Sequence, residues 1–304
     1  MFEKYPGSTF LKNLPDDSEF FPLRERIVEL FRFLDDLEDR HFEQQLDRDP
    51  HARLWEMMLA MVLKSEGYEL KSADHGPDFV IEKEDKRVFI EAVCPGPGDE
   101  SNPNSVPPTV HGAPIAQEVP IPQIVLRIRS ALEDKKRKYK DYIEQGIVSS
   151  DDCCVIALSS SKLSPRAKLW PPTIMRATHG LGSPYVIFGK GEGVVGEGIE
   201  SCESIPKVSG EDIDTRFFLS EENGLISAVL YSDCSFFSLV FDVFEESMFI
   251  HNPKAHVPVP QGLIKGIKDI WTICCHDSSE WRAYRIRDAQ QTAGGNGENA
   301  VPQP

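Results

Sequence analysis

The chain of 304 residues contains no apolar run of about 18 residues, which is the length that a membrane-spanning helix needs. We therefore expect no membrane span and no membrane partner. Residues 1–17 are polar, are interrupted by proline and lack the apolar segment of a secretory signal peptide. No internal repeat is visible. These absences predict a globular, cytoplasmic protein.

Zinc-binding cysteine motifs are absent as well. The seven cysteines include no Cys-x-x-Cys pair, which argues against a zinc site, and their odd number is typical of a reducing compartment. A cysteine-dependent hydrolase would need a histidine beside a cysteine, and no local pattern suggests one. We expect the cysteines to act as small core side chains. They are Cys94, Cys153, Cys154, Cys202, Cys234, Cys274 and Cys275.

Positive charge is scarce. The chain has 33 Lys and Arg against 49 Asp and Glu, so its formal net charge is −16. This balance argues against a general nucleic-acid coat protein, because phosphates would be repelled overall. A local basic cleft is still allowed, since charges are screened beyond about 8 Å at physiological salt.

Apolar periodicity predicts helices that alternate with short strands. Three helices are expected, at Leu23–Leu46, His51–Glu66 and Ile124–Gln145. Four strands are expected around them, at Tyr68–Lys71, Asp78–Glu82, Arg87–Val93 and Cys153–Leu158. A proline-rich loop spans Cys94–Pro122. Further strands are expected near Tyr185–Phe188, Leu225–Tyr231, Phe237–Val243 and Met248–His251.

These elements suggest four regions. Residues 1–48 form an N-terminal arm and helix, and residues 49–165 form the α/β core, in the order α-β-β-β-α-β. Residues 166–288 form a β-rich extension packed on that core. Residues 289–304 have the polar, Gly-rich and Pro-rich composition of a disordered tail.

Two acids interrupt apolar strands. Asp78 follows Gly76-Pro77 at the start of one predicted strand, and Glu91 lies in the next, within Val88-Phe89-Ile90-Glu91. A buried carboxylate is costly unless its charge is compensated, and a divalent cation held between two carboxylates compensates it. Structural alternatives stay open, because Asp78 could stabilise a turn and Glu91 could lie on a solvated edge strand.

The predicted element order, with Pro77-Asp78 before one strand and Glu91 late in the next, resembles the PD-(D/E)XK or restriction-endonuclease-like nucleases. The resemblance covers about residues 50–160. It implies a mixed sheet flanked by helices, with Asp78 and Glu91 as ligands of Mg²⁺ or Mn²⁺. In that family a lysine two residues after the glutamate assists the attacking water.

This chain has Val93 at the position of that lysine. Lys135 is the candidate replacement, since it falls in the middle of the apolar stripe of the third predicted helix. The resemblance implies that the lysine can move to this helix. The alternative is that Lys135 buries only its stem and extends its amine to the surface.

The remaining candidates surround this pair. The resemblance implies a further acid from the first core helix, and Glu56 is placed to supply it, although it could instead form surface ion pairs with nearby cations. The basic stretch Arg127–Lys140 includes the predicted nucleic-acid contacts Arg127, Lys136 and Lys138, and Lys136 is expected on the helix face opposite Lys135. A solvated helix face is the alternative interpretation of this stretch.

The sequence therefore predicts a metal-dependent nuclease that prefers DNA to RNA. Its catalytic residues would be Asp78, Glu91, Lys135 and Glu56. Because Val93 replaces the motif lysine, the alternative is a catalytically inactive binding or scaffold protein with the same fold. A homodimer is compatible with either function.

Overall fold

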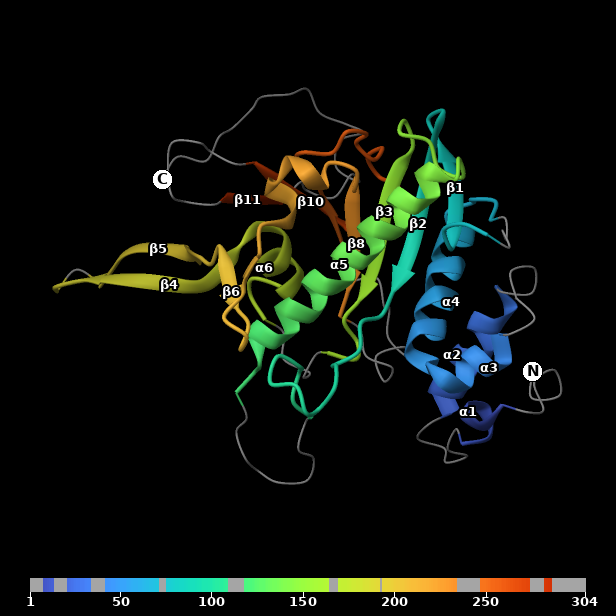
Figure 1. Ribbon diagram of the computed structural model, residues 1–304, viewed down its shortest axis with the longest axis horizontal. Coiled ribbons are helices and arrows are strands. Elements are labelled where there is room, and N and C mark those ends of the chain that lie inside the picture. Colours follow the sequence, from blue (N-terminus) through green and yellow to red (C-terminus); the bar gives the residue numbers. More distant parts are fainter. Residues whose placement is uncertain are drawn as a thin grey trace.

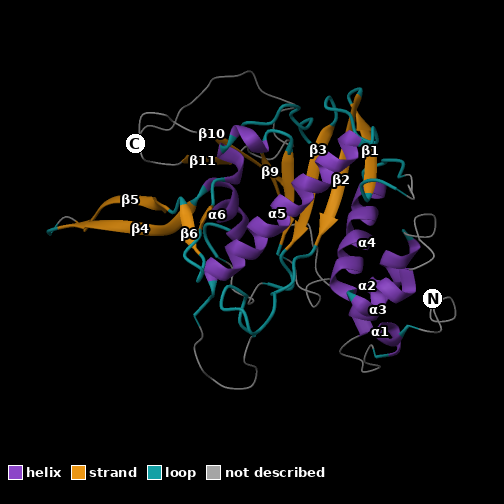
Figure 2. Cartoon of the chain, in the orientation of Figure 1, coloured by secondary structure: helices purple, strands orange, loops and turns teal. Residues whose placement is uncertain are grey.

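The computed structural model describes nine stretches of the chain: residues 8–13, 21–33, 42–70, 75–108, 118–163, 169–191, 193–233, 247–273 and 282–285. Within them, helices pack on both faces of a mixed β-sheet (Figures 1 and 2). The predicted class, a mixed α/β protein with a mixed sheet flanked by helices, is confirmed.

The main sheet has seven strands in the order β1-β2-β3-β8-β9-β10-β11. β1 is antiparallel to β2, and β2, β3 and β8 then run parallel to one another. β8 and β9 are antiparallel, β9 and β10 parallel, and β10 and β11 antiparallel. The strands are β1 Phe79–Lys83, β2 Lys86–Val93, β3 Cys153–Ser159, β8 Ala228–Ser232, β9 Met248–His251, β10 Lys268–Ile273 and β11 Arg282–Arg285.

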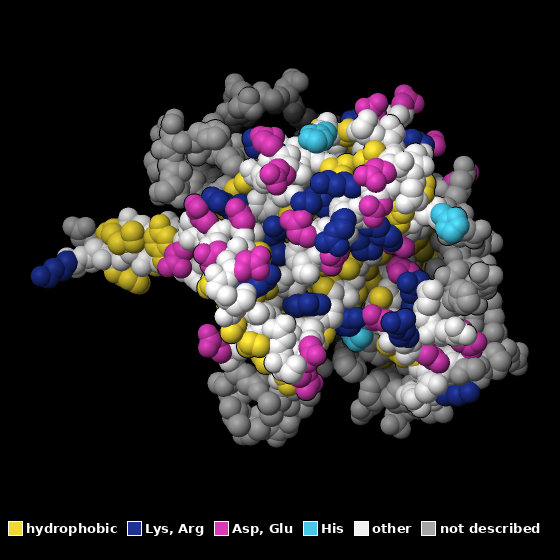
Figure 3. All heavy atoms as spheres, in the orientation of Figure 1, with side chains coloured by type: hydrophobic (Ala, Val, Ile, Leu, Met, Phe, Trp, Pro, Cys, Tyr) yellow, Lys and Arg dark blue, Asp and Glu magenta, His cyan; other side chains and the backbone are white. Residues whose placement is uncertain are grey.

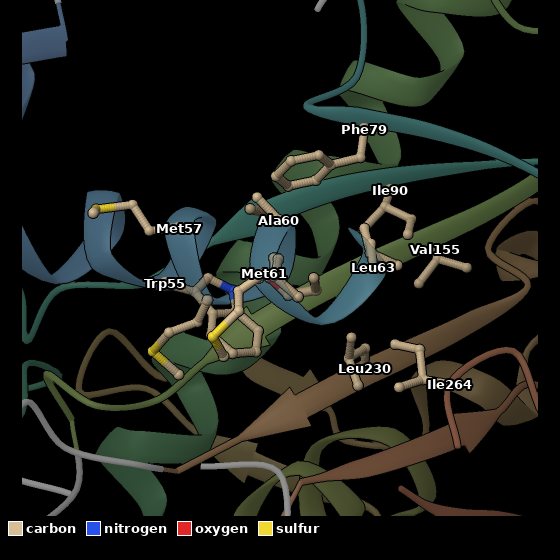
Figure 4. Packing of buried hydrophobic residues seen from close by; sticks show 14 of the residues in the cluster. Trp55, Met57, Ala60, Met61, Leu63, Phe79, Ile90, Val155, Leu230 and Ile264 are labelled. Carbon is tan, nitrogen blue, oxygen red and sulfur yellow. Dashed lines mark hydrogen bonds between the residues drawn. The ribbon is translucent and has the colours of Figure 1, made fainter. Parts of the chain in front are cut away.

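Two layers of helices cover this sheet. α4 (Pro50–Ser65) lies on one face with α2 (Phe21–Arg32) and α3 (Phe42–Arg48), and α5 (Ile121–Glu144) lies on the other with α6 (Thr173–His179). A short helix, α1 (Thr9–Lys12), precedes them and contacts α3. The two hydrophobic clusters are separated by the sheet, and Figure 4 shows part of the one beneath α4.

Alternation along β2 decides which side chains reach which layer. Val88 and Ile90 pack with the α4 cluster, whereas Phe89 packs with the α5 cluster. Successive side chains of a strand point to opposite faces, so Glu91 points toward α5.

Along the sequence, several smaller elements lie between β3 and β8. β4 (Leu181–Gly189) and β5 (Gly193–Ser201) form a separate two-stranded sheet that projects from the body of the molecule (Figure 1). β6 (Ser204–Pro206) pairs with β7 (Asp212–Asp214), and two short 3-10 helices follow, η2 (Phe217–Leu219) and η3 (Glu221–Asn223).

Most local predictions match these elements, with offsets of a few residues at their ends. The helices α4 and α5 and the strands β1, β2, β3, β4, β8 and β9 occur where they were expected. In the proline-rich loop, residues 94–108 and 118–120 contain no helix or strand. The predicted strand Phe237–Val243 and the tail after residue 288 lie outside the described residues.

The single helix expected at Leu23–Leu46 is wrong. α2 ends at Arg32 and α3 begins at Phe42. In one straight helix, Phe31 and Phe42 would be about 16 Å apart along the axis, but their ring centroids are 5.8 Å apart. The two helices are therefore not collinear, and they bury their apolar sides in the same cluster.

The strand expected at Tyr68–Lys71 is also wrong for the residues that the structure describes. Residues 68–70 are not in a strand, and Lys71 lies outside the described range. Tyr68 and Leu70 still pack against the α4 cluster, which explains the alternating pattern. In the described part of the core the order is accordingly α-β-β-α-β, with one strand fewer than predicted.

The strands β8 to β11 lie in the region predicted as a C-terminal extension. β8 pairs directly with β3, and the three strands beyond it continue the same sheet. The sheet that carries Glu91 is therefore built from both halves of the chain.

Candidate active site

Glu91 is the most constrained member of the candidate site. It lies near the carboxyl end of β2 and has no exposed surface. β2 lies between β1 and β3 in the sheet, and the register pairs Glu91 with Ile156 of β3, so the edge-strand interpretation of Glu91 is wrong. A carboxylate at this position needs charged or hydrogen-bonding partners to offset its desolvation.

Three side chains of α5 supply these partners. Lys135 Nζ lies 2.5 Å from Glu91 Oε2. Lys138 Nζ lies 2.9 Å from Oε1 and 3.0 Å from Oε2. The Tyr142 hydroxyl donates to Oε1 over 2.8 Å. These positions are three and four residues apart and thus share one helix face.

The surroundings of Glu91 keep Lys138 protonated. Although burial lowers the pKa of Lys138, its interaction with Tyr142 and the charge of Glu91 raise that pKa on balance. Burial, together with Glu91, raises the pKa of Tyr142 to about 12, against the opposing effect of Lys138. Tyr142 consequently remains a neutral phenol and a hydrogen-bond donor at neutral pH.

Asp78 lies immediately before β1, beside Glu91. Its Oδ2 accepts a hydrogen bond of 2.7 Å from the backbone N–H of Ala92. This bond ties the residue before β1 to β2. Asp78 reaches solvent, yet partial desolvation and then the charge of Glu91 raise its pKa, while Lys135 and the Ala92 bond lower it.

Glu56 approaches the same group of charges from α4. Its side chain is 18% exposed, and its Oε2 lies 2.6 Å from Arg53 Nη1, one turn earlier on the helix. Burial, and then the charge of Asp78, raises the pKa of Glu56 to about 8, against the lowering effect of Arg53. Glu56 therefore both forms the predicted ion pair and responds to the charge of the candidate site.

The donor chemistry of this group suits a hard divalent cation. Magnesium prefers oxygen ligands and is commonly held by one or two carboxylates, with waters or substrate oxygens completing its coordination. Asp78 and Glu91 would supply two such carboxylates. Among the described residues, no group of three or more His, Cys, Asp or Glu side chains is arranged to hold a metal. A cation here would thus depend on these two acids and on non-protein ligands.

The predicted nucleic-acid contacts have different surroundings. Lys138 pairs with Glu91, and Arg127 Nε donates to the Gly96 carbonyl over 2.8 Å. Lys136 lies 2.5 Å from Asn223 Oδ1 and 2.6 Å from Glu133 Oε2. Lys136 was expected on the helix face opposite Lys135, but its side chain is only 13% exposed because Asn223 of η3 contacts it.

A basic face nevertheless forms around α5. Figure 3 shows Lys and Arg side chains gathered on the face of the molecule that this helix crosses. Arg137 and Lys140 are exposed on α5, and the Lys138 side chain is 44% exposed while it reaches Glu91. Positive charge is thus concentrated beside the buried acid, in a chain whose net charge is −16.

A second polar cluster next to this site was not predicted. Cys94 follows β2, and its Sγ lies 3.3 Å from Ser161 Oγ. Ser161 Oγ lies 3.4 Å from His51 Nδ1 at the start of α4. Burial raises the pKa of Cys94 and lowers that of His51, so the thiol stays protonated and the imidazole neutral near pH 7.

One sequence signal could have indicated this cluster. Cys94 is the first residue after β2 and Ser161 the second after β3, and these strands turn out to be parallel neighbours whose carboxyl ends lie side by side. His51 reaches these strand ends because Asp49 begins α4 there and pairs with Lys162 over 2.6 Å. The raised pKa of Cys94 does not favour a thiolate nucleophile.

The chain matches no protein-family model, no curated protein and no solved structure among those compared with it. Within the described stretches, none of the helices has both the length and the apolar composition needed to cross a bilayer.

Proposed function

We propose that this protein is a metal-dependent phosphodiesterase that cleaves DNA, with RNA as the less preferred substrate. The observation that carries the proposal is the 2.5 Å contact between Lys135 Nζ and Glu91. Lys135 of α5 brings an ammonium group to Glu91. On the strand of Glu91 itself, Val93 occupies the position at which the resembled nucleases carry lysine.

The arrangement of the neighbouring elements supports a restriction-endonuclease-like core. β1 and β2 form an antiparallel hairpin, β3 is parallel to β2, and α5 connects β2 to β3 across one face of the sheet. The acids lie on the hairpin, and the lysine lies on the connecting helix. The expected first strand is absent at residues 68–70, so the proposal does not depend on a complete αβββαβ core.

Each residue has a distinct role in this proposal. Asp78 and Glu91 would hold Mg²⁺ or Mn²⁺, which when bound supplies Lewis-acid stabilisation of the phosphate and a more acidic water. Lys135 would orient the attacking water and stabilise negative charge on the phosphate. Lys138 and Tyr142 would position the Glu91 carboxylate through their hydrogen bonds.

Glu56 is a supporting acid in the same proposal. Its raised pKa indicates that a proton occupies this carboxyl in the absence of a cation near neutral pH. Because its ionised form would add negative charge next to Asp78, Glu56 would contribute most strongly after a divalent cation has entered. The basic face over α5 supports a polyanionic substrate (Figure 3).

The decisive experiment measures cleavage of linear, circular and single-stranded DNA, and of RNA, with Mg²⁺, with Mn²⁺ and with EDTA. We expect metal-dependent cleavage by the unmodified protein. Asp78→Asn, Glu91→Gln and Lys135→Gln should each reduce the rate about 100-fold or more, in the range expected for a lost catalytic group. Asp134→Asn, an exposed acid on α5, is the matched control and should cleave normally.

Folding must be separated from catalysis in this experiment. Glu91→Gln removes the buried charge partner of Lys135 and Lys138 and can lower stability by several kcal/mol. Asp78→Asn changes a solvent-exposed side chain and is the cleaner variant. Full activity of a folded Asp78→Asn protein would overturn the proposed function.

An inactive nucleic-acid-binding module is the second candidate, and one specific observation favours it. Both oxygens of Glu91 are already engaged by Lys135, Lys138 and Tyr142, as in a structural ion-pair network. DNA binding by the unmodified protein without cleavage under any metal condition would support this second function.

A further inference from the structure

The β4–β5 hairpin, called the arm below, exposes an unusual amount of apolar surface. Six of the eight exposed large hydrophobic side chains among the described residues belong to it. They are Tyr185, Val186, Ile187, Phe188, Val194 and Val195. Figure 3 shows this apolar stretch along the arm, where it projects away from the sheet and helices.

The register of the arm assigns these residues to two faces. Tyr185 pairs with Gly198 and Ile187 with Gly196. A methyl group at position 198 would lie 2.5 Å from the Tyr185 hydroxyl, so the tyrosine lies flat across the glycine. This face therefore covers part of its own apolar surface.

The opposite face has no such cover and is called the Phe188 face. Val186 pairs with Glu197, and Phe188 pairs with Val194. Phe188 is 73% exposed and Val194 is 58% exposed. Both strands belong to a sheet of only two strands, so nothing else in the described part of the chain pairs with their outer edges.

Exposed apolar surface of this kind is typical of an interaction site. The six side chains are 37–73% exposed and are divided between the two faces of the ribbon. The largest apolar patch of a typical monomer covers about 300–600 Å² and is often functional. Such a surface on a projecting ribbon is suited to contact with another molecule.

We propose that the arm binds the arm of a second copy of this chain, with the two Phe188 faces in contact and the two ribbons antiparallel. The proposal does not depend on the nuclease activity proposed above. A two-fold axis at the Phe188–Val194 pair would stack these side chains on their equivalents in the second copy. This isologous contact would make a closed dimer.

The position of charge along the arm selects this orientation. Lys190 lies in the turn, two residues beyond Phe188, and the pair Val186–Glu197 lies two residues before it. With the axis at Phe188, Lys190 of one copy meets Glu197 of the other at both ends of the contact. Parallel ribbons would instead place Lys190 beside Lys190 and Glu197 beside Glu197, which is unfavourable.

The charged side chains along the arm change from basic at its free end to acidic at its base (Figure 3). Figure 3 shows a basic side chain at the free end of the arm and acidic side chains where the arm joins the body. β5 carries a second acid, Glu200, which lies farther from the turn than Glu197. Glu192 lies in the turn but outside the described residues, so the test below reverses Lys190 alone.

The first test measures molar mass against protein concentration by sedimentation velocity and light scattering. We expect a reversible monomer–dimer equilibrium for the unmodified chain. Phe188→Ser and the double variant Phe188→Ser/Val194→Ser should be monomeric over the same range. Val208→Ser removes an equally exposed apolar side chain (71% exposed) outside the arm and should dimerise normally.

The second test uses charge reversal to verify the antiparallel register. Lys190→Glu alone and Glu197→Lys alone place like charges together and should weaken dimerisation several-fold, as expected for exposed ion pairs of about 0.2–1 kcal/mol each. A mixture of the two variants should form a heterodimer as tight as the original dimer, because both of its charge contacts are then complementary.

Two results would overturn the proposal. One is an unmodified chain that stays monomeric up to the solubility limit. The other is a dimer whose strength is unaffected by Phe188→Ser, since the contact would then lie elsewhere. Loss of dimerisation with normal far-ultraviolet circular dichroism would separate a lost contact from a lost fold, and DNA cleavage is not part of either readout.

Discussion

At the scale of single residues, the two carboxylates of the candidate site, Glu91 and Asp78, differ in burial and in their hydrogen-bond partners. Glu91 is completely buried and bound by two ammonium groups and a phenol, whereas Asp78 reaches solvent and accepts one backbone hydrogen bond. The cost of burying Glu91 is offset only while its partners stay charged. A substitution of Asp78 therefore tests the chemistry of the site, whereas a substitution of Glu91 changes the chemistry and the folding together.

The protonation of Glu56 leads to a residue-scale prediction about stability. The pKa of Glu56 rises from an ordinary value of 4.5 to about 8 in the folded protein. An acid with a raised pKa contributes its stability at low pH and loses it as the pH rises through the folded pKa. In EDTA, Glu56→Gln should match the unmodified protein near pH 4 and exceed its free energy of unfolding by about 2–4 kcal/mol at pH 8.5.

Chemical denaturation at several pH values measures this difference. Glu222→Gln, an exposed acid in η3, is the control and should follow the unmodified protein at every pH. If the stabilities of Glu56→Gln and of the unmodified protein change in parallel between about pH 5 and pH 8.5, the raised pKa of Glu56 is wrong.

At the scale of elements, the start of α4 connects the helix to the sheet. Asp49 Oδ1 accepts a hydrogen bond of 3.2 Å from the Ala52 N–H, and Oδ2 lies 2.6 Å from Lys162 Nζ. Pro50 provides the first helical residue, for which its φ is suited. The same carboxylate thus caps α4 and holds it to the segment after β3.

Asp49→Ala should lower the free energy of unfolding by about 1–2 kcal/mol, because it removes the N-cap and leaves the first turn without an acceptor. The midpoint of urea denaturation measures this loss. Asp151→Ala, an exposed aspartate in the turn before β3, serves as the control and should have little effect. Equal effects of the two substitutions would show that the cap does not stabilise α4.

Local sequence patterns predicted elements well where one face of the element is buried by a continuous layer. α5 is the clearest case, since its apolar stripe placed Lys135 inward and the structure agrees. The prediction at Tyr68–Lys71 was wrong because burial alone produced the alternation, without a neighbouring strand. A strand is defined by its hydrogen-bonded partner, which a local pattern does not contain.

At the scale of the whole molecule, the main sheet contributes side chains to a hydrophobic core on each of its two faces. Leu230 of β8 belongs to the cluster under α4, and Leu132 of α5 belongs to the cluster on the opposite face, and both are fully buried. The Tyr139 hydroxyl of α5 donates toward the carbonyls of Phe89 and Val155, which joins the second layer to β2 and β3. Removing contacts on either face should therefore weaken the same cooperative unit.

Leu132→Ala and Leu230→Ala should each reduce the free energy of unfolding by about 2–5 kcal/mol, the usual range for such cavities. Thermal unfolding followed by circular dichroism and by tryptophan fluorescence should show one transition at one lowered midpoint for each variant. Val208→Ala, at an exposed site, is the control. Separate transitions for the two probes would show that the two cores unfold independently.

The sequence by itself determined the class of the fold, the hairpin that carries Asp78 and Glu91, and the inward position of Lys135. These features depend on periodicity and on short spacings, which local chemistry encodes. Only the tertiary structure decided that Lys138 and Tyr142 also bind Glu91, that His51 lies beside Ser161 and Cys94, and that the arm stays uncovered. These outcomes depend on contacts between segments far apart in the chain, and such contacts are set by strand register and by the packing of layers.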